Sequence, residues 1–148
     1  MQQLFSGLEQ AFLDYRGEIE AFEKKRRPTD GLLGFGHSLR DDACHDRLDE
    51  KVERAAAAIA GSCPSPEEAE RAVRFLLSRA EQPWPLAAQW MLRAVDRHCI
   101  PLIPFLLPEA AGAIYREYAA RYRPFDRLPA QKELLKALKK AQDPKNDH

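Results

Sequence analysis

The chain has 148 residues, and its 23 lysines and arginines balance 23 aspartates and glutamates, so its formal net charge is zero. That length suits one domain with a sizeable core, which needs neither a disulfide nor a metal to hold it together. A neutral molecule has no general attraction to nucleic acid or to anionic membranes, so any such binding would have to be local, and we expect no nucleic acid as a partner.

Three cysteines without a CxxC spacing argue against a secreted disulfide framework. Residues 1–5 do not combine a basic start with an apolar run of signal-peptide length. The longest apolar run, at residues 100–107, is interrupted by Pro101 and Pro104 and is far shorter than the roughly 20 residues of a membrane-spanning helix. These features predict a cytoplasmic protein without a membrane span.

Apolar side chains recur every three or four residues through the first part of the chain, which predicts an amphipathic helix. This seam consists of Phe5, Leu8, Phe12, Tyr15, Ile19 and Phe22. It would suit the core of a bundle or a coiled-coil dimer contact, and the bundle is favoured because coiled coils usually sustain more heptads. Four basic residues at 24–27 and then Pro28 end the helix.

Residues 29–37 form a glycine-rich connection that also contains Leu32, Leu33 and Phe35. It lacks the Gly-Lys-Ser/Thr ending of a phosphate loop, and no predicted strand precedes it. Residues 31–37 therefore suit either a packed connector or a lid over a site.

Two helices are predicted next, each with a start signal. Ser38 and Asp41 resemble a capping box, so one helix begins near Leu39 and ends at Gly61. Its inner line contains His45, Leu48, Val52, Ala55 and Ile59. The following helix begins after Ser65 with Pro66 and two glutamates, a pattern typical of a helix N-terminus.

A fourth helix follows the Pro-Trp-Pro corner at Trp84 and carries His98 on its inner line, before an apolar elbow at residues 100–107. Pro108 and Pro129 start two further helices, and no segment alternates like a strand. The prediction is an all-α, single-domain, irregular bundle of five or six main helices, several of them started by proline. It covers residues 1–142, and residues 143–148 form a short polar tail.

Two mirrored pairs, Cys44-His45 and His98-Cys99, are the only places where several soft ligands could meet. Imidazole and thiolate suit zinc, copper and iron, so His45 and His98 are the first candidate ligands. The further candidates are Cys44, Cys99, Asp41, Asp42 and Asp49. The alternative is structural, because buried cysteines often serve as small apolar residues and a histidine in the last turn of a helix is favoured by the dipole. No recognised ligand spacing is present, so we expect no cofactor, with a transition metal as the alternative.

The last helix places lysines on one side and leucines on the other. Lys132, Lys136 and Lys140 then form either a solvated face or a partner-binding surface. Trp84 would suit an anchor in the core or at the elbow, and the alternative is an interaction hot spot. No catalytic residue can be assigned. The first hypothesis is a small protein that acts by association with another protein or with itself. The alternative hypothesis is a metal- or thiol-dependent protein centred on Cys44, His45, His98 and Cys99.

Overall fold

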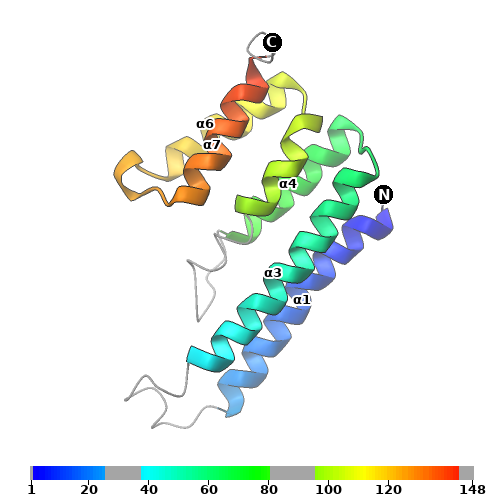
Figure 1. Ribbon diagram of the computed structural model, residues 1–148, viewed down its shortest axis with the longest axis vertical. Helices are drawn as coiled ribbons and strands as arrows, with labels where there is room; N and C mark the ends of the chain where they lie inside the picture. The colour runs from blue at the N-terminus through cyan, green and yellow to red at the C-terminus, as the bar shows by residue number, and fades with distance from the viewer. Residues whose placement is uncertain (1, 26–37, 81–95, 144–148) are drawn as a thin grey trace.

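The computed structural model describes residues 2–25, 38–80 and 96–143, and for residues 2, 19, 22–25, 38–45, 80 and 126 the backbone alone (Figure 1). The α-helices are α1 (Gln2–Lys25), α3 (Ser38–Gly61), α4 (Pro66–Ala80), α6 (Pro108–Arg121) and α7 (Pro129–Gln142). Two short 3₁₀ helices, η1 (Ile100–Phe105) and η2 (Pro124–Asp126), connect them, and residues 96–99 are helical and lead into η1. These segments contain no strand, so the all-α prediction is confirmed.

The residues predicted to begin helices are found at the N-termini of helices in the structure. Prolines begin α4, α6 and α7. Before α4 the Ser65 hydroxyl accepts a hydrogen bond from the Glu68 amide, and the Glu68 carboxylate accepts one from the Ser65 amide, both at 3.2 Å. At α7 the Gln131 side chain accepts a hydrogen bond from the Leu128 amide at 2.8 Å. Each bond satisfies an amide near a helix start that has no partner within the helix.

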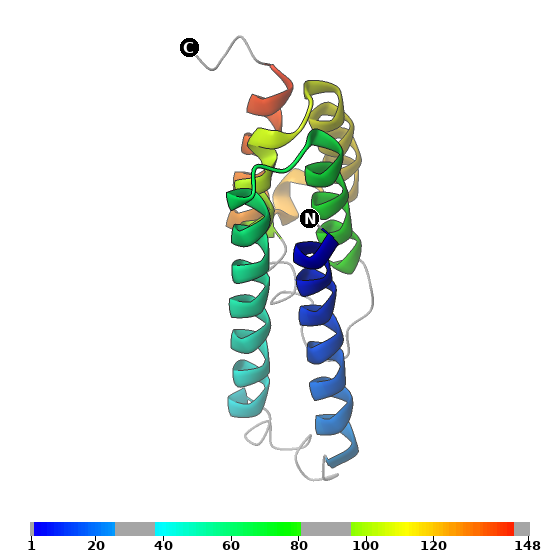
Figure 2. The same cartoon turned by 90° about the vertical axis from the view of Figure 1, so that its right-hand side faces the viewer.

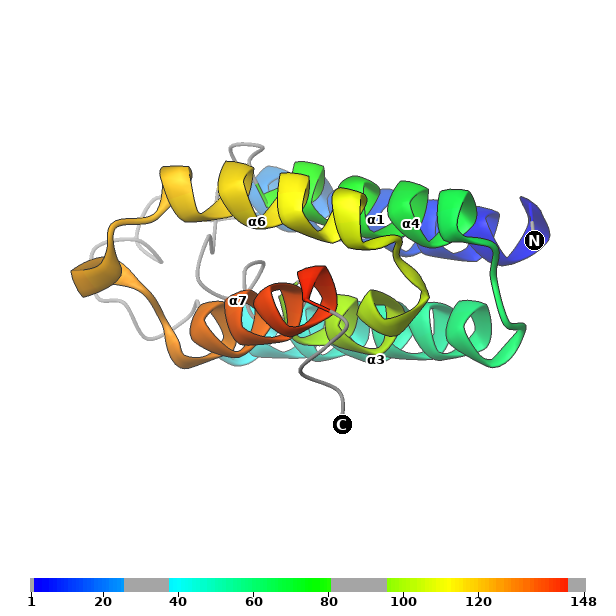
Figure 3. The same cartoon turned by 90° about the horizontal axis from the view of Figure 1, so that it is seen from above.

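The helices form two layers, with α1, α4 and α6 in one and α3, η1 and α7 in the other (Figure 3). Figure 2 shows α1 and α3 running side by side as a long antiparallel hairpin, and α6 and α7 form a second, shorter one. Between the hairpins, η1 lies against α3, α4 and α7. The predicted apolar elbow is therefore a 3₁₀ helix that joins the two halves of the bundle.

One core runs through both layers. Its most deeply buried large apolar residues come from every main helix and from η1: Leu8, Tyr15, Val52, Ile59, Val73, Leu76, Leu102, Ile114, Leu134 and Leu138. Phe5 and Phe12 of the first-helix seam are buried within the chain as well, which confirms the bundle interpretation for that part of the seam. The side chains of Ile19 and Phe22 lie outside the described residues.

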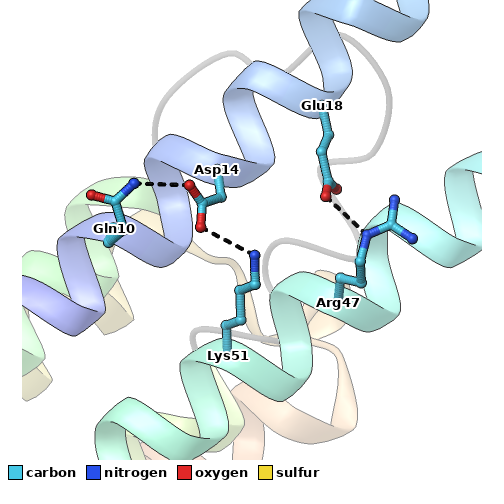
Figure 4. Close-up of polar contacts among 5 residues, drawn as sticks. All are labelled: Gln10, Asp14, Glu18, Arg47 and Lys51. Carbon is cyan, nitrogen blue, oxygen red and sulfur yellow. Dashed lines mark hydrogen bonds and ion pairs between the residues drawn. The ribbon is translucent and has the colours of Figure 1, made fainter.

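Two ion pairs define the register of the long hairpin (Figure 4). Lys51 Nζ lies 3.1 Å from Asp14 Oδ2, and Arg47 Nε lies 2.9 Å from Glu18 Oε1. Glu18 lies one turn after Asp14 on α1, whereas its partner Arg47 lies one turn before Lys51 on α3. This opposite order is the one that two antiparallel helices produce. Gln10 also donates to Asp14 at 2.8 Å, and this bond, followed by that of Lys51, lowers the pKa of the Asp14 carboxyl.

In the segments that the structure describes, no helix is both long enough and apolar enough to cross a lipid bilayer. The connection at residues 31–37, the Trp84 corner and most of the predicted fourth helix lie outside those segments.

Candidate functional site

An open groove with a volume of about 710 Å³ lies between α1 and α4. Its floor is aromatic: the Phe75 ring meets Phe5 edge-on at a centroid distance of 5.1 Å and Phe12 at 5.8 Å. Phe5 and Phe12 lie two turns apart on one face of α1, so a single ring from α4 contacts both. Leu13, next in sequence, lines the groove with 60% of its surface exposed and adds apolar surface beside the aromatic floor.

Arginines surround this floor. The Arg71 guanidinium lies 4.2 Å from the Phe5 ring centroid, and that of Arg79 lies 4.6 Å from the Phe75 centroid, both within the range of cation–π attraction. The groove is lined by Arg16, Arg71, Arg74 and Arg79 against one acid, Glu9. The lining of the groove thus places several guanidinium groups beside exposed apolar surface.

Two of these arginines are held by acids of the chain itself. Arg74 contacts Glu70 and Glu117, each at 2.9 Å, and Arg16 lies 3.5 Å from Glu20. Such pairs fix the position of a guanidinium more than they add stability at an exposed site. The Arg71 guanidinium lies over the Phe5 ring, and its N–H groups can donate hydrogen bonds to a carboxylate.

A second cluster surrounds His98, at the end of the helix that leads into η1. Its Nε2 atom lies 2.8 Å from Asp49 Oδ1 of α3, and its side chain is 7% exposed. Glu53, one turn after Asp49, brings a third ligand atom, and the three atoms lie within 4.8 Å of one another. A buried imidazole and two carboxylates thus meet at the surface of α3.

Behind this cluster lies a buried polar group. Asp96 is fully buried, and its Oδ1 accepts a hydrogen bond of 2.7 Å from the Tyr118 hydroxyl. Its Oδ2 has no hydrogen-bond partner among the described residues. Burial raises the pKa of the Asp96 carboxyl to about 7, although the bond from Tyr118 opposes the rise. Burial, and then the neighbouring Asp96, also raise the pKa of Tyr118.

The structure makes Cys99 an apolar core residue. It is completely buried, and burial together with Asp96 raises the pKa of its thiol well above the ordinary value. A thiol that stays protonated is a poor nucleophile and a poor metal ligand. The group that gathers around His98 in the described segments contains Asp49 and Glu53 and does not include Cys99.

The other predicted site residues fall into two groups: those whose side chains the structure does not describe, and the exposed lysines of α7. Asp41, Cys44 and His45 belong to α3, but their side chains are outside the description, so the predicted approach of His45 to His98 stays a prediction. Trp84 is outside it entirely. The α7 lysines are exposed as expected: Lys132, Lys136 and Lys140.

Sequence reasoning named Asp49 as a partner for a histidine but missed Glu53. The available signal was helical spacing, because Glu53 follows Asp49 by four residues and therefore lies on the same face. It also missed the groove, since neither the packing of Phe75 on α1 nor the stacking of Arg71 follows from spacing within one helix.

Comparisons of the chain with protein-family models, with curated proteins and with solved structures found no match.

Proposed function

We propose that the protein acts by binding another protein, and that the groove between α1 and α4 holds an acidic amphipathic helix of that partner. The observation that carries the proposal is the joining of exposed apolar surface to arginine. Leu13 and Phe75 offer apolar contact, while Arg71 offers hydrogen-bond donors to a carboxylate at the same place. Aromatic and arginine side chains are the residues that most often dominate protein interfaces.

The shape of the groove favours a helix as the occupant. The axes of α1 and α4 run in similar directions (Figure 2), and the groove lies open between them. An amphipathic helix can occupy a groove of this kind with side chains three and four residues apart. Its polar side would face Arg16 and Arg71, so glutamates and aspartates are the complementary residues. This is why we propose an acidic partner rather than a basic one.

A cytoplasmic location belongs to the same proposal. Cys63 is an exposed free thiol and Cys99 a buried one. Thiols of this kind persist in a reducing compartment.

The test uses two synthetic helical peptides with identical apolar faces, one with glutamates and one with lysines on the polar face. Fluorescence anisotropy should show that the glutamate peptide binds more tightly, and that rising salt weakens its binding, because the rim contacts are charged. Arg71→Glu and Leu13→Glu should each weaken binding at least about tenfold, a change of roughly 1.4 kcal/mol.

Arg54→Glu is the matched control, because Arg54 is an exposed arginine of α3 away from the groove. It should leave binding unchanged. Equal binding of both peptides, or an Arg71→Glu variant that binds like the original protein, would contradict the proposal. If Lys136→Glu weakens binding instead, the partner surface lies on α7.

Self-association through the groove is a distinct outcome. A second copy as the occupant would appear as a concentration-dependent sedimentation coefficient that Arg71→Glu abolishes. Sedimentation that is independent of concentration, combined with binding of the acidic peptide, supports a different protein as partner.

A further inference from the structure

We propose that Asp49, Glu53 and His98 bind a divalent transition-metal cation at the surface of α3, separately from the groove. The three residues supply one imidazole nitrogen and two carboxylate oxygens, the mixed donor set that suits zinc and its first-row neighbours. The ligands come from two elements that are distant in sequence, because α3 carries both acids and the histidine lies just before η1. Binding would therefore link the long hairpin to the segment that leads into η1.

Charge around the cluster supports a cation. Other acids of the α1–α3 hairpin have basic partners: Lys51 pairs with Asp14, Arg47 with Glu18, and Arg54 with Glu50. Among the described side chains, no lysine or arginine lies within 4.0 Å of the carboxylates of Asp49 or Glu53. Two carboxylates one turn apart repel each other without a cation between them.

The geometry needs only small adjustments. Zinc bonds of about 2.0–2.2 Å would bring tetrahedral ligand atoms to roughly 3.4 Å from one another. The present separations are at most 4.8 Å, and the His98–Asp49 contact of 2.8 Å would open as the ion replaces the hydrogen that joins the two groups. Glu53 is exposed and can move inward at little cost, whereas buried His98 is already held in place.

Three protein ligands leave room for water or for a further ligand, an arrangement typical of accessible metal sites. Access is direct, because the Asp49 side chain is 37% exposed and Glu53 lies on the outer surface. A hydrogen bond between His98 and Asp49 alone would explain the position of His98, but it would assign no role to Glu53. The test therefore depends on Glu53.

Zinc binding to the metal-free, tag-free protein is measured at neutral pH by isothermal titration, and cobalt absorption spectra report coordination by nitrogen and oxygen. We expect one equivalent of zinc. Glu53→Gln should weaken binding at least roughly tenfold, the loss that even groups behind a metal ligand cause when removed. Because Glu53 is exposed, this variant tests the site without disturbing the core, whereas Asp49→Asn and His98→Gln should abolish binding.

Glu50→Gln is the matched control, since it removes an exposed acid of the same helix that is already paired with Arg54. It should bind zinc like the original protein, and so should Cys63→Ser, which removes the exposed thiol. Failure to bind zinc at micromolar concentrations overturns the proposal. So does binding that persists unchanged in Glu53→Gln or in Asp49→Asn.

Discussion

At the scale of single residues, Asp96 carries the most unusual environment in the described chain. Its carboxyl is enclosed in the core, and the one hydrogen bond from Tyr118 leaves Oδ2 without a partner among the described residues. A buried carboxylate loses the hydration that stabilises its charge, so the neutral form is favoured. The folded protein therefore holds this proton to a pKa of about 7, while an unfolded aspartate loses it near 3.8.

This difference predicts a pH-dependent stability with a defined sign. Between about pH 4 and 7 the folded state binds one more proton than the unfolded state, so the free energy of unfolding falls as pH rises. The slope contributed by Asp96 approaches about 1.4 kcal/mol per pH unit and disappears above pH 7 to 8. Asp96→Asn should remove it, because an amide does not titrate.

Urea unfolding at pH 5.0, 6.0, 7.0 and 8.0 checks this prediction in the original protein and in Asp96→Asn. The stability of the variant relative to the original should increase from pH 5.0 to about 7 and then level off. If the free energies of unfolding of the two proteins change with pH in the same way, the prediction is wrong. Asp96 would then be ionised over the whole pH range despite its burial. Tyr118→Phe serves as a control that removes the hydrogen bond but keeps the carboxyl.

At the scale of the element, α7 divides cleanly into two faces. Leu134, Leu135 and Leu138 are buried, while Lys132 and Lys136 are exposed, so the predicted placement of leucines and lysines on different sides is confirmed. The helical period of 3.6 residues places the leucines on one face, and that face packs against η1 and α6. Whether the lysines also bind a partner remains a prediction.

Substitutions on the two faces of α7 should differ sharply in cost. Leu138→Ala should lower the free energy of unfolding by about 2–5 kcal/mol, because a cavity remains in the core. Charge reversal at Lys136 and Lys140 should change it by no more than about 0.5 kcal/mol, as is usual for a solvated face. Chemical denaturation measures both, and a large loss on charge reversal would mean that the basic face is packed against something.

At the scale of the whole molecule, η1 decides whether the two hairpins behave as one unit. It lies against α3, α4 and α7, and Leu102 at its centre is completely buried. We expect Leu102→Ala to cost about 2–5 kcal/mol and to weaken both hairpins together. Hydrogen exchange should then show equal losses of protection in α3 and in α7, whereas a loss confined to α7 would reveal two separately stable parts.

The overall charge balance also has meaning only at this scale. A net charge of zero excludes a general electrostatic field, yet it hides a local arginine cluster on one face and an acidic pair beside His98 on another. The net charge of the chain therefore does not reveal these two local groups of like charge, on which the two proposals depend.

The sequence by itself determined the helices and their inner faces, because periodicity, capping residues and prolines act within a few neighbouring positions. It predicted helix starts near Leu39 and at Pro66, Pro108 and Pro129, and it placed His98, which is buried, on an inner line. It could not determine which surfaces meet, since such contacts join residues far apart in sequence. Only the tertiary structure brought Asp49 and Glu53 to His98, enclosed Asp96 beside Tyr118, and joined Phe75 of α4 to Phe5 and Phe12 of α1. Helical propensity is local, whereas packing and desolvation depend on the whole fold.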